Sequence, residues 1–203
     1  MEAKKISMCP EFNEQEAIRR AKQGDNTALG ALYEEHVDAI YRYMLYRTHD
    51  HQVAEDLTAE VFTNMITSIE RYEDRGLPFG AWLFRIARAR IVDHWRRSNR
   101  RAEKEVAFSP EAEEFLVGDS PELRFEHEAL LKALQYLTDA EQEVILLRFA
   151  GGLSNREIAK VTDSNSSAVK SMTHRALKKL RKVLERKQAF NRNLSRGADG
   201  KRK

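Results

Sequence analysis

One stretch of the chain, residues 79–101, constrains the fold more than any other, and it reads FGAWLFRIARARIVDHWRRSNRR. Its apolar side chains recur with a period of about 3.6 residues, which predicts an amphipathic helix with one buried face. That face holds Phe79, Leu83, Ile86, Ala87 and Ile91. Because such a face must be covered by other elements, the stretch predicts a bundle of helices.

The other side of this predicted helix is rich in arginine. Between Arg75 and Arg101 there are eight arginines, no lysine and a single acid, Asp93. The planar guanidinium group matches phosphate oxygens and stacks on bases, so this choice of cation favours nucleic acid. Trp82 and Trp95 lie among the arginines and can stack on unpaired bases. The plainer alternative is a core helix with a solvated basic face.

Charge is distributed unevenly along the 203 residues. The formal net charge of the whole chain is only +3, yet 75–101 carries +7, 103–128 carries −7 and 168–203 carries +11. This basic, acidic, basic order points to a nucleic-acid partner more strongly than the total charge does.

Hydrophobic periodicity and turn residues predict an all-α protein with two helical domains. Three amphipathic helices with short connections place the first domain at 13–98. Residues 99–121 lack periodicity and predict an acidic, flexible linker, and a second domain follows at 122–186. The remaining ends are predicted to be a mobile N-terminus at 1–12 and a basic, disordered tail at 187–203.

The second domain shows the pattern of a helix-turn-helix. Residues 138–141 and 154–157 both match the capping box that begins a helix. A short helix, a turn at 162–164 and a longer basic helix from about Ser166 follow, and in this motif the second helix enters the major groove. The side chains expected to reach base edges and phosphates are Asn165, Ser166, Ser167, Lys170, Ser171, His174 and Arg175. A generic three-helix packing unit has similar apolar spacing.

Composition and motifs argue against other classes of protein. A single cysteine, Cys9, excludes an internal disulfide, and no secretory or membrane-spanning run is visible, so we expect a cytoplasmic protein without membrane insertion. No nucleophile–base set, Walker-type loop or zinc spacing is present, and His49 with His51 lacks a third ligand. We therefore expect no catalytic residues, no metal and no cofactor.

Three blocks of the sequence carry a resemblance to a known family. The blocks are AEDLTAEVF at 54–62, PFGAWLFRIARARIVDHWRR at 78–97, and 137–184, which begins LTDAEQEVILLRFAGGLSNREIAKV. In this order and spacing they resemble the extracytoplasmic-function (ECF) sigma factors of the sigma-70 family, over about 25–98 and 122–185. The resemblance implies an initiation subunit, not itself an enzyme, that binds core RNA polymerase, recognises −35 and −10 promoter elements and promotes strand opening.

The resemblance also implies roles for particular residues. The first domain corresponds to sigma region 2, which docks on the polymerase β′ clamp helices through Asp56, Leu57, Glu60, Val61 and Phe62. Capture of the −10 element is implied for Arg75, Phe79, Trp82, Arg85, Arg88, Arg96 and Arg97. The second domain corresponds to region 4, whose partners are the −35 element and the β flap. The acidic linker resembles the connector toward the polymerase active site, and such factors are commonly held inactive by an anti-sigma factor.

Several positions depart from the family pattern, and two other functions compete with it. Ala89 stands where the family often has Asn, while Asp163 and Ser164 replace a Gly and an apolar residue in the turn. Asp tolerates the left-handed conformation, but Ser164 gives up a core contact, so we expect altered −35 specificity. The competing functions are a free-standing helix-turn-helix regulator and a helical, anti-sigma-like adaptor without a DNA role. Both leave the arginine-rich helix or the 54–62 block unexplained.

Overall fold

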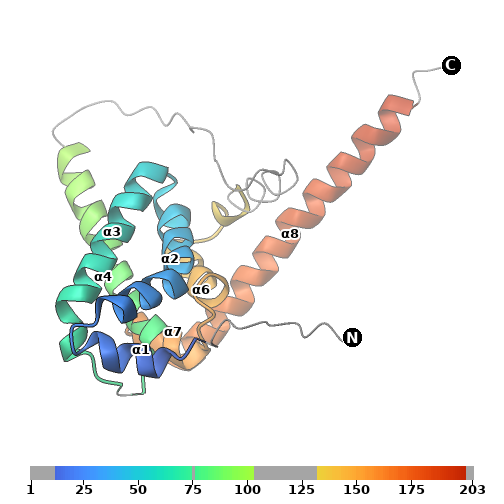
Figure 1. Ribbon diagram of the computed structural model, residues 1–203. Helices are drawn as coiled ribbons and strands as arrows, with labels where there is room; N and C mark the ends of the chain where they lie inside the picture. Colours follow the sequence, from blue (N-terminus) through green and yellow to red (C-terminus); the bar gives the residue numbers. More distant parts are fainter. Residues whose placement is uncertain (1–11, 75, 103–131, 200–203) are drawn as a thin grey trace, which may run out of the picture.

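The computed structural model describes residues 12–74, 76–102 and 132–199, and every regular element in these ranges is a helix, which confirms the all-α prediction (Figure 1). The elements are α1 (Glu14–Ala21), α2 (Asn26–Thr48), α3 (His51–Ser68), the 3-10 turn η1 (Ile69–Arg71), α4 (Phe79–Ala102), α6 (Asp139–Phe149), α7 (Asn155–Val161) and α8 (Ser166–Asp199). We call α1–α4 the N-terminal bundle and α6–α8 the C-terminal bundle.

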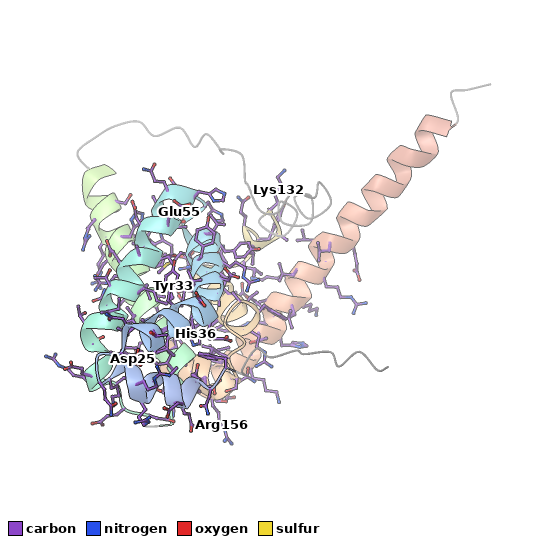
Figure 2. All side chains as sticks on the ribbon, viewed as in Figure 1. Asp25, Tyr33, His36, Glu55, Lys132 and Arg156 are labelled. Carbon is purple, nitrogen blue, oxygen red and sulfur yellow. The ribbon has the colours of Figure 1, made fainter. Side chains whose placement is uncertain are left out.

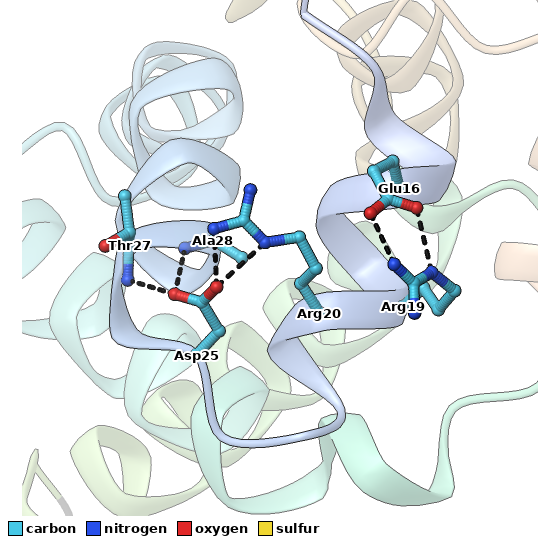
Figure 3. A network of polar contacts seen from close by, with 6 residues as sticks. All are labelled: Glu16, Arg19, Arg20, Asp25, Thr27 and Ala28. Atoms are coloured by element: carbon cyan, nitrogen blue, oxygen red, sulfur yellow. Dashed lines mark hydrogen bonds and ion pairs between the residues drawn. The ribbon is translucent and has the colours of Figure 1, made fainter.

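Side-chain caps explain where the first long helices begin. Asp25 accepts hydrogen bonds from the backbone N–H groups of Thr27 (2.9 Å) and Ala28 (3.2 Å) at the start of α2 (Figure 3). Arg20 on α1 donates to the same carboxylate at 2.8 Å and, as the largest cause, lowers the pKa of Asp25. Asp50 caps α3 by accepting from Val53 N at 3.0 Å. These bonds satisfy amides that a helix N-terminus leaves without partners.

The core of the N-terminal bundle is apolar and aromatic. Its largest fully buried side chains are Leu32, Ile40, Tyr43, Met44, Leu45, Met65, Ile69, Phe79, Leu83 and Ile91. The ring of Tyr43 packs edge-on against Phe84 with centroids 5.5 Å apart. Outside this core, His36 pairs with Glu14 on α1 at 2.9 Å, so it is a satisfied histidine at the edge of the core.

The C-terminal bundle begins at its two predicted capping boxes. Thr138 and Glu141 exchange hydrogen bonds with each other's backbone amides at the start of α6, and Ser154 and Glu157 do the same at α7. Glu141 is buried, and Lys179 on α8 reaches it at 2.6 Å. The bond from Lys179, ahead of that from the Thr138 backbone, lowers the pKa of Glu141. This ion pair ties the first helix of the bundle to the last.

The two bundles, expected to be separate domains, pack against each other. Helix α7 lies beside α4, and α6 lies beside α2 (Figure 1). Gly151, in the turn after α6, approaches Phe84 so closely that an added Cβ would lie 2.7 Å from the ring. Lys160 on α7 donates to the carbonyl oxygen of Gly76. The packing between the bundles joins residues that are distant in sequence, and helical periodicity does not predict such contacts.

Two helices run further than predicted. Helix α4 continues to Ala102, so 99–102 belongs to a helix and not to the linker, whose other residues, 103–121, lie outside the described ranges. Helix α8 continues to Asp199, which corrects the prediction of a disordered tail for 187–199. Both extensions consist mainly of residues that favour or tolerate a helix, and Arg, Lys, Gln, Leu and Ala predominate among them. The predicted N-terminal segment 1–11 also lies outside the described ranges.

Candidate nucleic-acid interface

A hollow between α3 and α4 brings together part of the predicted −10 set. Its volume is about 410 Å³, and it is lined by Asn64, Ser68, Arg71, Tyr72, Trp82, Arg85, Ile86, Ala89 and Arg90. Arg85 is exposed, and Trp82 is half-buried with its ring 5.0 Å from that of Tyr72. Three guanidinium groups beside an aromatic wall can neutralise phosphates and stack a base.

The aromatic wall is supported from below by Phe79, which was expected to contact DNA. Phe79 is only 1% exposed, and its ring lies 5.3 Å from Trp82 and 5.2 Å from Tyr72. Its side chain is therefore a core side chain that positions Trp82, which corrects the expectation of direct contact. Burial, followed by the charges of Asp74 and Glu14, raises the pKa of Tyr72 to about 12. The neutral Tyr72 hydroxyl donates to Leu77 O at 3.2 Å.

The remaining arginines of the predicted −10 set lie on other faces of α4. Arg88 points toward the C-terminal bundle, where its Nε lies 3.6 Å from Glu143 Oε1. Arg96 and Arg97 are exposed more than two turns further along α4. Arg97 lines a small cleft with Asp56 and Glu60 of α3. Arg75 lies outside the described residues. The structure thus places Arg85 and Trp82 together but does not bring all seven residues to one surface.

The predicted polymerase-docking residues divide between core and surface. Leu57, Val61 and Phe62 are buried, with Leu57 5% exposed at the edge of a small cleft, and their role in docking stays a prediction. Asp56 is exposed, and Glu60 is partly exposed with its Oε2 3.9 Å from Arg90. Figure 2 shows Glu55 of the same helix near the opposite end of the view from Arg156 of α7. Asp56 and Glu60 are thus the members of the predicted docking set whose side chains reach solvent.

The helix-turn-helix has the geometry expected from its sequence. Asp163 adopts the left-handed conformation with φ 52°, as its tolerance for this region predicts. Ser164 is exposed and lies outside the core, while its backbone N–H donates to Ala159 O at 2.8 Å. Asn165 then caps α8 by accepting from Ala168 N at 2.7 Å. The turn is closed by backbone bonds even though it lacks an apolar residue at Ser164.

All seven residues of the predicted −35 face are exposed. They occupy the N-terminal turns of α8, which α6 and α7 support from the other side: Asn165, Ser166, Ser167, Lys170, Ser171, His174 and Arg175. Val169 and Ala176, on the inward side of the same turns, are fully buried. Short polar and basic side chains on a rigid, exposed helix start are suited to base edges and phosphates in a major groove.

The structure adds residues that the sequence interpretation missed. Asn64 comes from α3 and Arg71 from η1, yet both line the same hollow as Arg85. Arg47 is a buried cation on α2, with a side chain 3% exposed and its guanidinium carbon 4.4 Å from the centre of the Trp95 ring. No local pattern marks these residues, because each acquires its place from a helix distant in sequence.

Among residues 12–74, 76–102 and 132–199, none of the helices has the length and hydropathy that a membrane-spanning segment requires. The same ranges contain no group of three or more His, Cys, Asp or Glu side chains placed to hold a metal ion.

Comparison with family models and curated proteins gives consistent matches. The model described as Sigma-70 region 2 matches residues 32–101, and the one described as Sigma-70, region 4 matches 127–180. The chain is 38% identical over 178 residues to the ECF RNA polymerase sigma factor BldN of Streptomyces coelicolor, covering 83% of this chain and 65% of that relative. It is 32% identical over 161 residues to the ECF RNA polymerase sigma factor SigX of Bacillus subtilis, covering 76% of this chain and 82% of that relative.

Solved structures share the fold. CnrH in complex with the cytosolic domain of CnrY matches with a TM-score of 0.65 and 24% identity, over 85% of this chain and 97% of that chain. The sigma factor RpoE in complex with the anti-sigma factor NepR, from Bartonella quintana, matches with a TM-score of 0.61 and 23% identity, over 75% and 94%.

Proposed function

Because the chain belongs to the ECF RNA polymerase sigma factors of the sigma-70 family, we propose that it directs core RNA polymerase to promoters and opens the DNA there. The observation that carries the proposal is the presence, in one chain, of an exposed recognition-helix face and an arginine-lined hollow beside Trp82. The first suits duplex DNA and the second suits an unpaired strand. A free-standing helix-turn-helix regulator binds duplex DNA and does not need a site for an unpaired strand.

The N-terminal bundle is proposed to capture the −10 element as a single strand. Arg71, Arg85 and Arg90 are placed to neutralise backbone phosphates, and Trp82 offers a ring face for a base. Ala89 lines the hollow without a side-chain donor or acceptor, so base recognition here relies on its other walls. The C-terminal bundle is proposed to read the −35 element through residues 165–175.

Core RNA polymerase is the proposed protein partner, with the β′ clamp helices on α3 and the β flap on the C-terminal bundle. Within the predicted docking set on α3, Asp56 is exposed and Glu60 is partly exposed, and Leu57 supports them from the core. An anti-sigma factor is a second proposed partner, since RpoE from Bartonella quintana was solved with the anti-sigma factor NepR.

Co-purification with core RNA polymerase tests the polymerase contact. We expect the full chain to associate and the Asp56→Ala, Glu60→Ala variant to lose most of this association while remaining folded, because both changes are at the surface. The control is Glu34→Ala with Glu35→Ala, which removes two exposed acids from α2. Retained association in the first variant contradicts the proposed docking face. Absence of core binding by the full chain, with duplex DNA binding intact, favours the free-standing regulator.

Open-complex formation tests the hollow. Arg85→Ala is expected to weaken strand opening by the assembled holoenzyme while leaving core binding intact, and to flatten the log–log salt dependence of single-strand binding by about 0.7. Arg19→Ala, an exposed arginine of α1 paired with Glu16, is the control and should change neither quantity. Equal effects of the two substitutions contradict a specific role for the hollow.

A further inference from the structure

A cluster of four side chains joins the two bundles around one carboxylate. Glu143 of α6 accepts a hydrogen bond from the hydroxyl of Tyr43 on α2 at 2.8 Å, through Oε1. Arg88 of α4 approaches the same oxygen, with its Nε at 3.6 Å, and Arg47 of α2 approaches Oε2 at 3.8 Å. We call these four residues the Glu143 cluster. A single acid of the C-terminal bundle thus faces two cations and a hydroxyl of the N-terminal bundle.

The cluster is largely removed from water. The Glu143 side chain is 12% exposed, that of Arg47 3% and that of Arg88 35%, and Tyr43 is fully buried. In this environment Tyr43 stays protonated, because burial and the charge of Glu143 raise its pKa well above the ordinary value. A buried charge needs compensation, so Arg47 requires an anion at this position, whereas Arg88 is partly solvated.

The carboxylate of Glu143 does not satisfy all the hydrogen-bond donors of Arg47 and Arg88. Arg47 also donates to Gln142 Oε1 and to Asp139 O, both at 3.4 Å, while the Nε atoms of Arg47 and Arg88 are buried without a hydrogen-bond partner. A carboxylate and a phosphate offer arginine the same kind of charged acceptor. Glu143 therefore occupies a position at Arg88 that a nucleic-acid phosphate can also fill.

We propose that Glu143 acts as an intramolecular anion that holds the C-terminal bundle on the N-terminal bundle and keeps Arg88 from nucleic acid. This inference rests on the proposed function of α4 in strand capture. The contacts of Phe84 with Gly151 and of Lys160 with Gly76 lie in the same interface and add to its closure. The −35 face stays exposed in the closed form, so closure restrains the N-terminal bundle and not duplex binding by α8.

The covalent connection does not account for the closed arrangement. Residues 103–131 separate Ala102 from Lys132, and a chain of that length can span roughly 100 Å when extended. The association of the bundles in the free protein depends on the interface, in which the Glu143 cluster is the charged element.

The test compares Glu143→Gln with the wild-type chain. Gln keeps the length of the side chain, an acceptor for Tyr43 and a similar helix propensity, but it removes the charge that faces Arg47 and Arg88. The control is Glu185→Gln, which removes one acid from the same bundle where its partner, Arg181, is exposed. Neither position belongs to the proposed DNA or polymerase contacts.

Two readouts are measured on the free, full-length protein. The distance between bundles is followed by energy transfer between dyes at Gln52→Cys and Lys182→Cys, both exposed, after replacement of Cys9 by Ser. Strand binding is followed by the anisotropy of a fluorescein-labelled oligodeoxythymidine. Loss of a charge-assisted contact is expected to raise the open population at least about tenfold. Glu143→Gln should therefore show lower transfer efficiency and about tenfold tighter strand binding, whereas Glu185→Gln should match the wild type.

Three results overturn the inference. Unchanged transfer and affinity in Glu143→Gln show that the carboxylate does not hold the bundles together. Lower transfer without tighter binding shows that closure does not mask the strand site. Equal gains in Glu185→Gln show a general effect of charge. Promoter-dependent transcription by the wild-type holoenzyme is measured alongside. If the holoenzyme shows no such transcription, the proposed function is refuted. If it does transcribe, any of the three results refutes only the masking of the strand site.

Discussion

Gly151 offers a quantitative test of how tightly the two bundles fit. An added Cβ would lie 2.7 Å from Leu147 O, 2.7 Å from Phe84 Cε2 and 2.9 Å from Phe84 Cζ. Ordinary contact begins at 3.4 Å, so the atoms must separate by 0.7 Å, the difference between 3.4 and 2.7 Å. Leu147 O also accepts the backbone bond from Leu153 N at 3.2 Å, which closes the turn before α7. Relief of the clash must therefore disturb this turn or displace Phe84.

The expected cost of Gly151→Ala is that of overpacking a core, about 1–3 kcal/mol. At about 2–4 °C per kcal/mol for a chain of this size, the melting temperature should fall by about 2–12 °C. Thermal unfolding followed by far-ultraviolet circular dichroism measures this change. Gly30→Ala is the matched control, because Gly30 is exposed within α2 and its Cβ would meet nothing within 4 Å. That change should stabilise the protein by about 0.5–1 kcal/mol, since alanine is the better helix former.

A double variant identifies which neighbour causes the cost. If Phe84 is the main obstacle, Phe84→Leu should make Gly151→Ala less costly than it is in the wild-type chain. If Leu147 O is the main obstacle, the two costs should add. A Gly151→Ala protein that melts at or above the wild-type temperature, while Gly30→Ala behaves as expected, refutes the steric reasoning and the close fit of the bundles.

Three further changes test local contacts by denaturant or thermal unfolding. Thr138→Ala removes the side-chain half of a capping box and should cost about 0.5–2 kcal/mol. Because the pKa of Glu141 is lowered, its carboxylate adds stability above its unfolded pKa, near 4.5, and this stability is lost as the pH falls through the lower folded pKa. Glu141→Gln should therefore lower stability at neutral pH and flatten its decline in acid, and an unchanged acid limb contradicts the pairing with Lys179. Arg47→Ala leaves Glu143 with fewer cations and should cost about 3–5 kcal/mol, so a near-neutral result argues against a buried ion pair.

Local chemistry in the sequence was sufficient for the elements of the fold. The capping boxes that begin at Thr138 and Ser154 mark helix starts within one residue, because a cap acts on amides two or three positions away. The left-handed turn at Asp163 and the exposed recognition face follow from similarly short-range rules. Family resemblance then supplied the order of the two domains.

Sequence reasoning was weaker wherever the answer depends on a distant partner. The helical pattern placed Phe79 on the buried face of α4, whereas the family resemblance implied a DNA contact, and the packing of its ring against Tyr72 and Trp82 agrees with the helical pattern. Leu57 belongs to the family motif at 54–62, yet in the folded chain its side chain is buried against the core. The contacts between bundles had no signal at all, since they join residues whose separation in sequence is large.

The separation between Tyr43 and Glu143 has a consequence during synthesis. The two residues are 100 positions apart, so the whole N-terminal bundle is made well before the acid that neutralises Arg47 and Arg88. The bundle ends at Ala102, 41 residues before Glu143, so at roughly 5–20 residues per second the delay is about 2–8 s. During that interval the nascent chain has a folded basic surface with no carboxylate to cover it. On a translating ribosome, where RNA phosphates are abundant, each new molecule passes through a stage in which its arginines are open to any polyanion nearby.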